Sequence, residues 1–255
     1  MENNKLFNFE LKKLDEKDIL EKIEKFMMAP DGFFHIISLN PENIVLTSEV
    51  AEFNKVVTKA QIKLIDGVGV VLSGRLLGVP LGERVSGVDL MQDLVEMADR
   101  VRLRVVLIGA QQDLAERLAE CYSQSYKNAK FLGISGFNDV SNPKMEEEER
   151  LKSIVADFMP QIVFAAFGSP AQELWLDRHS SLFKNCVCMG VGGGFDFSIG
   201  AVPRAPKMLR TIGLEWLFRL VIQPWRWRRQ LRLFKFIFLV FKEKIHHLFP
   251  LNQQN

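Results

Sequence analysis

The feature of this sequence that most constrains its fold is a regular alternation of short apolar runs and longer amphipathic segments. Six runs have the length and composition of buried β-strands: residues 33–38, 62–65, 104–109, 130–135, 161–168 and 186–191. The segments between them carry apolar residues at helical spacing, which predicts helices at 42–54, 87–100, 111–126, 145–158 and 171–183. Strand and helix repeated this often predict an α/β fold, with a mostly parallel sheet and helices on both faces.

Glycines and polar residues gather where the predicted strands end. The strands are followed by SLNPEN, DGVG, GAQQD, FGSPAQE and GVGGGFDFS. Because the carboxyl ends of parallel strands line the ligand crevice of an open α/β sheet, we expect these segments to form a binding site.

The charge of the chain is unevenly distributed. The 255 residues carry a net charge of +2, yet residues 207–244 hold ten basic and two acidic side chains. This asymmetry indicates an anionic partner, which is nucleic acid, anionic lipid or a phosphorylated substrate. The change in composition predicts two parts, an α/β domain at 1–204 and a basic, aromatic C-terminal appendage at 205–255.

The appendage has the pattern of two helices broken near Pro224. In the second helix a wide apolar surface accompanies a basic stripe, formed by Arg228, Arg232, Lys235 and Lys242. Tryptophan and phenylalanine beside basic residues are typical of helices that lie in the interface of a membrane. Two alternatives are a helix that joins the subunits of a homo-oligomer and a core helix with solvated edges.

The remaining composition indicates a protein of the reducing cytoplasm that does not cross a membrane. The three cysteines are an odd number without paired spacing, which argues against a disulfide framework. The first 30 residues are charged and amphipathic, so we expect no signal peptide. No uncharged run reaches the roughly 18–20 residues that a membrane-spanning helix needs.

Two polar residues, Asp66 and Arg84, each allow two interpretations, and a third, Asn40, indicates a helix start. Asp66 follows an apolar strand and precedes two glycines, so it is either a general base in the crevice or the cap of the next helix. Asn40 precedes Pro41 in a typical helix start. Arg84 lies in a loop before a helix, where it pairs either with an anionic ligand or with a surface carboxylate.

Two glycine-containing strand ends are candidate nucleotide contacts. Gly109 precedes a helix whose first amides would favour phosphate, although GAQQDLA lacks the spacing of a dinucleotide fingerprint. Gly192, Gly193 and Gly194 weaken a strand unless a ligand approaches closely. Asp196 follows them, as a partner of a ribose hydroxyl or as a turn residue.

Several motifs are missing from the sequence. It contains no H-E-x-x-H, no zinc-like set of cysteine and histidine, no phosphate-binding G-x-x-x-x-G-K-[ST] loop and no D-x-D. We therefore expect no metal and no cofactor, with phosphate groups bound by arginines and helix amides.

Six segments in a fixed order resemble the WecG/TagA/CpsF family of bacterial glycosyltransferases: ISLNPENIV, IDGVGVV, GERVSGVDL, FGSPAQELW, GVGGGFDFSIGAVPRAP and GLEWLFRLVIQPWRWRRQ. They extend over roughly residues 33–230, and the RAP and EW-x-x-R-L blocks are the most specific. The resemblance implies a Rossmann-like core and an appendage that meets the membrane. It also implies transfer of a sugar from a UDP donor to a lipid-diphosphate-linked sugar, with inversion and without a metal.

The resemblance also implies roles for individual residues. Asp66 matches the proposed catalytic base, and Ser38 stands where the family commonly has threonine, so a supporting hydroxyl is retained. Three residues match positions that line the donor and acceptor pocket: Asn40, Arg84 and Gln172. Three residues of the appendage match arginines thought to engage the diphosphate: Arg219, Arg226 and Arg229.

The partners implied are a UDP-sugar, of N-acetylmannosamine type or a related hexose, a polyprenyl-diphosphate-linked acceptor and an anionic membrane surface, with a homo-oligomer as an open possibility and no nucleic acid. The expected location is the cytoplasmic face of the inner membrane, as a peripheral protein. Two other classes stay open. One is a non-catalytic membrane-docking protein with a nucleotide-binding fold, and the other is a nucleotide-dependent oxidoreductase.

Overall fold

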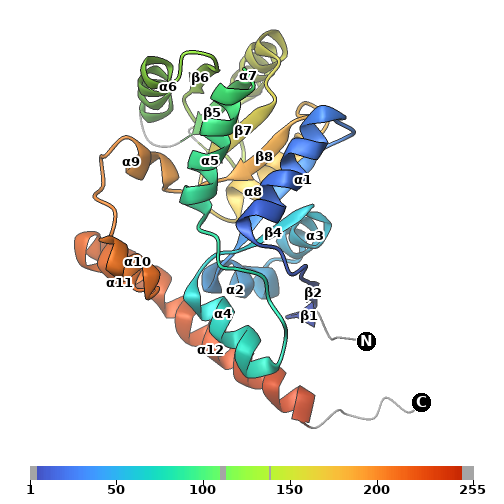
Figure 1. The fold of residues 1–255 in the computed structure, drawn as a ribbon, viewed down its shortest axis with the longest axis vertical. Helices are drawn as coiled ribbons and strands as arrows, with labels where there is room; N and C mark the ends of the chain where they lie inside the picture. Colours follow the sequence, from blue (N-terminus) through green and yellow to red (C-terminus); the bar gives the residue numbers. More distant parts are fainter. Residues whose placement is uncertain (1–4, 110–112, 138, 249–255) are drawn as a thin grey trace.

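The protein is described here from a computed structural model that covers residues 5–109, 113–137 and 139–248. Its centre is a six-stranded sheet in which every neighbouring pair is parallel, in the order β4-β3-β8-β7-β5-β6 (Figure 1). The strands are β3 (Phe34–Leu39), β4 (Ile62–Ile65), β5 (Arg104–Gly109), β6 (Lys130–Ile134), β7 (Ile162–Ala166) and β8 (Val187–Gly190). All six predicted strands are confirmed.

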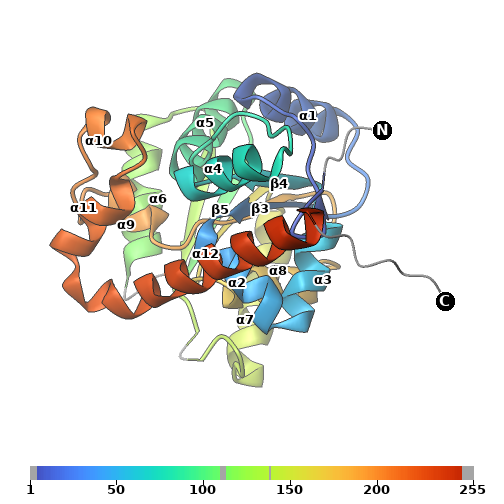
Figure 2. The same ribbon diagram turned by 90° about the horizontal axis from the view of Figure 1, so that it is seen from below.

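Helices cover both faces of the sheet, as the sequence predicts (Figure 2). One face packs against α1 (Glu16–Met28), α5 (Gly87–Arg100), α6 (Leu114–Ser125) and α9 (Gly194–Ser198). The other packs against α2 (Pro41–Glu49), α3 (Ala51–Lys59), α7 (Met145–Phe158) and α8 (Ala171–Arg178). The strand order turns around between β3 and β8, because the chain runs from β3 outward to β4 and later returns to β8 from the opposite side. A ligand crevice is expected at that switch point.

Three local features differ from the sequence prediction. The predicted helix at 42–54 is two helices, because the backbone at Val50 is extended between α2 and α3. Helix α1 was not predicted, although Asp15 and Asp18 form a capping box at its start. A short antiparallel pair, β1 (Lys5–Leu6) and β2 (Phe9–Glu10), was also missed.

The C-terminal appendage is helical and breaks at Pro224, as predicted. It consists of α10 (Lys207–Thr211), α11 (Glu215–Ile222), the 3-10 helix η1 (Pro224–Arg226) and α12 (Trp227–Leu248). Helix α12 crosses α2 and α4 (Val68–Leu77), as Figures 1 and 2 both show. Phe236 and Val240 of α12 are buried in the same apolar cluster as α2, α3 and α4. One face of α12 is therefore part of the core.

Two residues of the basic stripe of α12 pair with the α/β domain, and the contact of the stripe with lipid stays a prediction. Arg232 forms an ion pair of 2.7 Å with Glu42, and Lys235 forms one of 2.6 Å with Glu49. Both partners belong to α2, so these two cations hold α12 on the α/β domain. Of the other two stripe residues, Lys242 is exposed, and the side chain of Arg228 lies outside the described part of the structure.

A second apolar face of α12 is exposed. Its large side chains recur every three or four residues, which places them on one side of the helix: Trp227, Leu231, Phe234, Phe238, Phe241 and Ile245. Trp225 of η1 and Val221 of α11 are exposed as well. We call these residues the exposed apolar face. Among the described residues, no helix is long and apolar enough to cross a membrane.

Candidate active site

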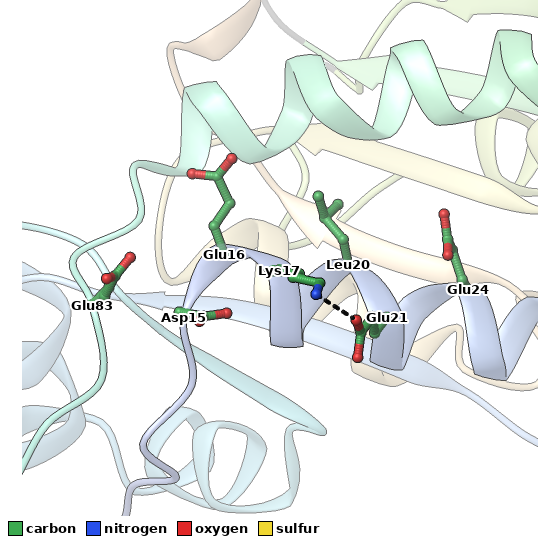
Figure 3. Close-up of a pocket in the computed structure, with 7 residues that line it drawn as sticks. All are labelled: Asp15, Glu16, Lys17, Leu20, Glu21, Glu24 and Glu83. Carbon is green, nitrogen blue, oxygen red and sulfur yellow. Dashed lines mark ion pairs between the residues drawn. The ribbon is translucent and has the colours of Figure 1, made fainter.

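A hollow on the described surface beside α1 is not the candidate site. It has a volume of about 580 Å³ (Figure 3). Its lining includes a pair of Lys17 with Glu21 at 3.7 Å, and five of its seven residues are acidic: Asp15, Glu16, Glu21, Glu24 and Glu83. Because these carboxylates repel a phosphorylated ligand, we place the candidate site at the strand ends instead.

Asp66 is the first residue after β4, beside the switch point of the sheet. Helix α4 begins at Val68, and its cap position is occupied by Gly67, with no side-chain hydrogen bond to the helix. The alternative interpretation of Asp66 as a helix cap is therefore wrong. Instead, its Oδ2 accepts a hydrogen bond from the backbone N–H of Gly87, at 3.4 Å.

Ser38 and Asp66 are brought together around Gly87, the first residue of α5. A Cβ atom at Gly87 would lie 3.0 Å from Ser38 Oγ and 3.5 Å from Asp66 Oδ2. The hydroxyl and the carboxylate therefore border the same small space, and only a glycine leaves it open. From the sequence, only the family resemblance indicates that Ser38 and Asp66 act together, because 27 residues lie between them.

The environment of Asp66 raises its pKa to about 6. Burial is the main cause, and the Glu215 carboxylate also raises the pKa. The Gly87 amide, Arg84 and Arg219 act in the opposite direction. A carboxyl group with this pKa is mostly ionised at neutral pH yet basic enough to accept a proton, which is the property of a general base.

Arg84 and Arg219 supply positive charge near Asp66 from two different parts of the chain. Arg84 Nη2 donates a 2.7 Å hydrogen bond to the backbone carbonyl of Arg210, in α10 of the appendage. The guanidinium of Arg219, in α11, lies 4.0 Å from the centre of the Phe197 ring. The appendage therefore contributes directly to the surroundings of Asp66.

The appendage also packs on the turn that carries Asp66. A Cβ atom at Gly213, between α10 and α11, would lie 2.5 Å from Val68 Cβ. A Cβ atom at Gly69 would lie 3.5 Å from the ring of Phe236 in α12. Close approach at these two glycines fixes the appendage against the first turn of α4.

Asn40 and Gln172 have structural contacts. Asn40 caps α2, with its Oδ1 accepting from the N–H of Asn43 at 2.8 Å. Gln172 is buried, and its Oε1 accepts from the N–H groups of Gly168 and Gly192 at 3.1 and 3.0 Å. Gln172 thus joins the loops that follow β7 and β8. The ligand-binding roles of Asn40 and Gln172 stay predictions.

The other predicted site residues are spread around the strand ends. Gly109 ends β5 with a φ of 100°, and the residues 110–112 that follow lie outside the described part. Asp196 lies in the first turn of α9, not in a turn between elements. Arg226 belongs to η1 and Arg229 to α12, but their side chains are not among those described. Their roles also stay predictions.

Two charged residues near Asp66 were missed by sequence reasoning. Arg204 lies in the loop before α10, where its Nη1 contacts Asp89 Oδ1 at 2.6 Å, and its Nε lies 3.8 Å from Oε1 of Glu215. Arg204 belongs to the RAP block and Glu215 to the EW-x-x-R-L block, which both carry the resemblance. That signal marked the segments but gave no role to either side chain.

Comparison with known proteins identifies the family. The family model described as "Glycosyl transferase WecG/TagA/CpsF family" matches residues 4–249. This chain belongs to that family. It is a glycosyltransferase, which excludes the non-catalytic and oxidoreductase classes that the sequence left open. The six resembling segments lie within the matched residues, and so does most of the appendage.

Two relatives carry a more specific name, N-acetylglucosaminyldiphosphoundecaprenol N-acetyl-beta-D-mannosaminyltransferase. The one from Bacillus subtilis (strain 168) is 32% identical over 209 residues, which cover 82% of this chain and 79% of the relative. The one from Staphylococcus aureus (strain NCTC 8325) is 30% identical over 213 residues, which cover 83% and 80%. The matches therefore extend over most of both chains.

Proposed function

We propose that this protein transfers an N-acetylmannosamine-type sugar from a UDP donor to a polyprenyl-diphosphate-linked N-acetylglucosamine, in the synthesis of a cell-surface polysaccharide. The names of the two relatives support the transferred sugar and the acceptor. The observation that carries the mechanism is the setting of Asp66, a carboxylate with a pKa of about 6 that faces Arg84 and Arg219.

The proposed reaction is a single displacement without a metal. The acceptor hydroxyl oxygen attacks the anomeric carbon and forms the new glycosidic bond, while its proton passes to the Asp66 carboxylate. The bond between the anomeric carbon and the β-phosphate oxygen breaks, and UDP leaves with the bonding electron pair. Attack from the side opposite to the leaving group inverts the anomeric centre.

Cationic groups are needed where negative charge grows on the departing diphosphate. Arg84 and Arg219 act on Asp66 electrostatically, so they are close enough to serve the same crevice. Electrostatic stabilisation of this kind is often the largest contribution to catalysis. Two further arginines of the appendage are proposed to act with them: Arg226 and Arg229.

The remaining site residues are proposed to bind the substrates. Ser38 supports the reacting hydroxyl, because its Oγ borders the same space as Asp66 Oδ2. Asn40 and Gln172 line the pocket, and Asp196 binds a ribose hydroxyl. Gly109 permits a phosphate to approach the start of α6.

We also propose that the protein works as a peripheral protein on the cytoplasmic side of the inner membrane. The exposed apolar face supports this location, because aromatic side chains at helical spacing are typical of helices that lie in the membrane interface. An acceptor that is anchored in lipid requires the active site to work close to that surface.

The experiment that tests the function is a panel of UDP-sugars with a polyprenyl-diphosphate-linked N-acetylglucosamine acceptor, with the product identified by mass spectrometry. We expect UDP-N-acetylmannosamine to give a disaccharide on the lipid, and anomeric NMR to show inversion. UDP-glucose and UDP-N-acetylglucosamine serve as matched donors. If no donor is transferred to the lipid-linked sugar, the proposed function is wrong.

A further inference from the structure

Arg204 joins the α/β domain to the appendage. Its Nη1 contacts Asp89 Oδ1 at 2.6 Å, and its Nη2 lies 3.5 Å from Ser86 Oγ; both partners are at the start of α5. Its Nε lies 3.8 Å from Glu215 Oε1, at the start of α11. The side chain is only 25% exposed, so these contacts are partly shielded from water. One guanidinium thus spans two helix starts that are far apart in the sequence.

Both ends of this bridge act on Asp66. Ser86 and Asp89 flank Gly87, whose N–H donates to Asp66 Oδ2. At the other end, the carboxylate of Glu215 acts on Asp66 as a like charge. The bridge therefore determines the position of one hydrogen-bond donor and one negative charge next to the proposed base.

We propose that Arg204 is a positioning residue of the transfer reaction, which holds the starts of α5 and α11 together and offsets the charge of Glu215 beside Asp66. The proposal rests on the proposed function, in which Asp66 accepts the proton of the acceptor hydroxyl. Arg204 belongs to the RAP block, which the sequence marked without a role. In this proposal the block links the appendage electrostatically to Asp66.

The charges around Asp66 determine in which direction each substitution should shift its pKa. The groups that face Asp66 or its bridge are Ser38 of β3, Arg84 before α5, the Gly87 amide and Asp89 of α5, Arg204 before α10, Arg210 of α10, and Glu215 and Arg219 of α11. Arg210 Nη1 lies 3.9 Å from Asp89, so Asp89 keeps a cationic partner when Arg204 is removed. Loss of Arg204 therefore acts on Asp66 in one direction, both by leaving Glu215 without this cation and by removing the charge of Arg204, which itself acts on Asp66 electrostatically.

Two substitutions are expected to move the titration of Asp66 in opposite directions. Glu215→Gln removes a like charge and lowers the pKa of Asp66, whereas Arg204→Gln leaves Glu215 less compensated and raises it. Each shift should be about 1 pH unit or less, the low end of the scale for a nearby charge, because neither group contacts Asp66 directly. In the double variant the two changes oppose each other, so the pKa returns toward the wild-type value. The readout is the carboxyl ¹³C resonance of Asp66 in the full-length protein, which needs no turnover.

Two further variants separate charge from geometry. Arg204→Lys keeps the charge but loses the planar fork, so we expect a nearly unchanged Asp66 titration with a kcat reduced about tenfold and a KM little changed. Lys207→Gln makes the same change of charge on an exposed residue of α10, three positions away, and should shift the Asp66 titration by less than about 0.2 unit. If Arg204→Gln does not fold, Glu215→Gln and Arg204→Lys still test the bridge.

The outcomes distinguish this proposal from the proposed function. Shifts of opposite sign in the two single variants, with neither seen in Lys207→Gln, support the bridge. Shifts of the same sign, or none beyond the control, overturn it. If the pKa of Asp66 shifts as expected but the wild type releases no UDP with a lipid-linked acceptor, the proposed function is wrong and the positioning role of Arg204 stands. If turnover occurs but neither substitution shifts the pKa of Asp66, the positioning role of Arg204 is wrong and the proposed function stands.

Discussion

At the scale of single residues, the site is defined by where one carboxylate lies. Asp66 follows the end of β4, accepts the Gly87 amide and faces positive charge from Arg84 and Arg219. None of these partners is next to Asp66 in the sequence. Burial raises its pKa while the arginines limit the rise, so it is ionised at neutral pH and still basic enough to take a proton.

The pH dependence of the reaction follows from this pKa. Because the base must be unprotonated, kcat/KM is expected to fall as the pH drops through about 6 and to level off above about 7. Measuring acceptor-dependent UDP release between pH 4.5 and 8 gives the acidic limb of the pH–rate profile. A rate that stays constant down to pH 4.5 would show that Asp66 is not the group whose ionisation matters.

Gly87→Ala tests the space between Ser38 and Asp66. The new Cβ atom would lie 3.0 Å from Ser38 Oγ and 3.5 Å from Asp66 Oδ2, where the reacting hydroxyl is expected. We expect turnover to fall about ten- to hundredfold, because small displacements at a reacting centre have large effects. Alanine is accepted at the first turn of a helix, so the melting temperature should change little. Full activity in a stable variant would argue that this space is not used.

At the scale of elements, the strands were easier to predict than the contacts of the helices. Apolar runs mark the strands directly, since buried parallel strands are apolar on both faces. The basic stripe of α12 gave no sign of its ion pairs, because Arg232 and Lys235 pair with Glu42 and Glu49 about 190 positions earlier in the chain. Arg204 and Glu215 were missed for the same reason. Partners distant in sequence leave no local pattern.

Gly213→Ala tests whether the appendage must pack on the turn that carries Asp66. The backbone there has a φ of 78°, and the new Cβ atom would lie 2.5 Å from Val68 Cβ. We expect a protein with an intact α/β domain, an appendage more easily cut by protease, and a turnover reduced at least about tenfold. Gly200→Ala is the matched control, because its φ of 75° imposes similar strain with no atom within 4 Å of the new Cβ. Equal effects of the two variants would count against appendage packing as the cause.

At the scale of the whole molecule, α12 has two apolar faces, one buried in the core and one exposed. Phe236 and Val240 complete the core, whereas the exposed apolar face is directed away from it. The ion pairs with α2 keep the helix in register on the domain while the aromatic residues stay outward. In the proposed docking, this arrangement would let the appendage meet a membrane while it stays packed beside the site.

Membrane binding is expected to depend on the exposed phenylalanines. Replacing Phe234, Phe238 and Phe241 by serine should weaken binding to anionic phospholipid vesicles at least about tenfold, because each ring loses apolar burial in the interface. The matched control replaces three exposed methionines of the α/β domain by serine: Met28, Met145 and Met159. Vesicle co-sedimentation measures both. Equal binding by the two triple variants would contradict a docking role for this face.

The central claim is that Asp66 takes the proton of the acceptor hydroxyl in a glycosyl transfer. The most direct measurement is UDP release that depends on the lipid-linked acceptor, made side by side for the wild type and Asp66→Asn, with UDP affinity measured in parallel. We expect the rate to fall by about 10²–10⁴-fold, the scale of the loss of a general base, with UDP binding preserved. An Asp66→Asn variant that retains the wild-type rate would contradict the account.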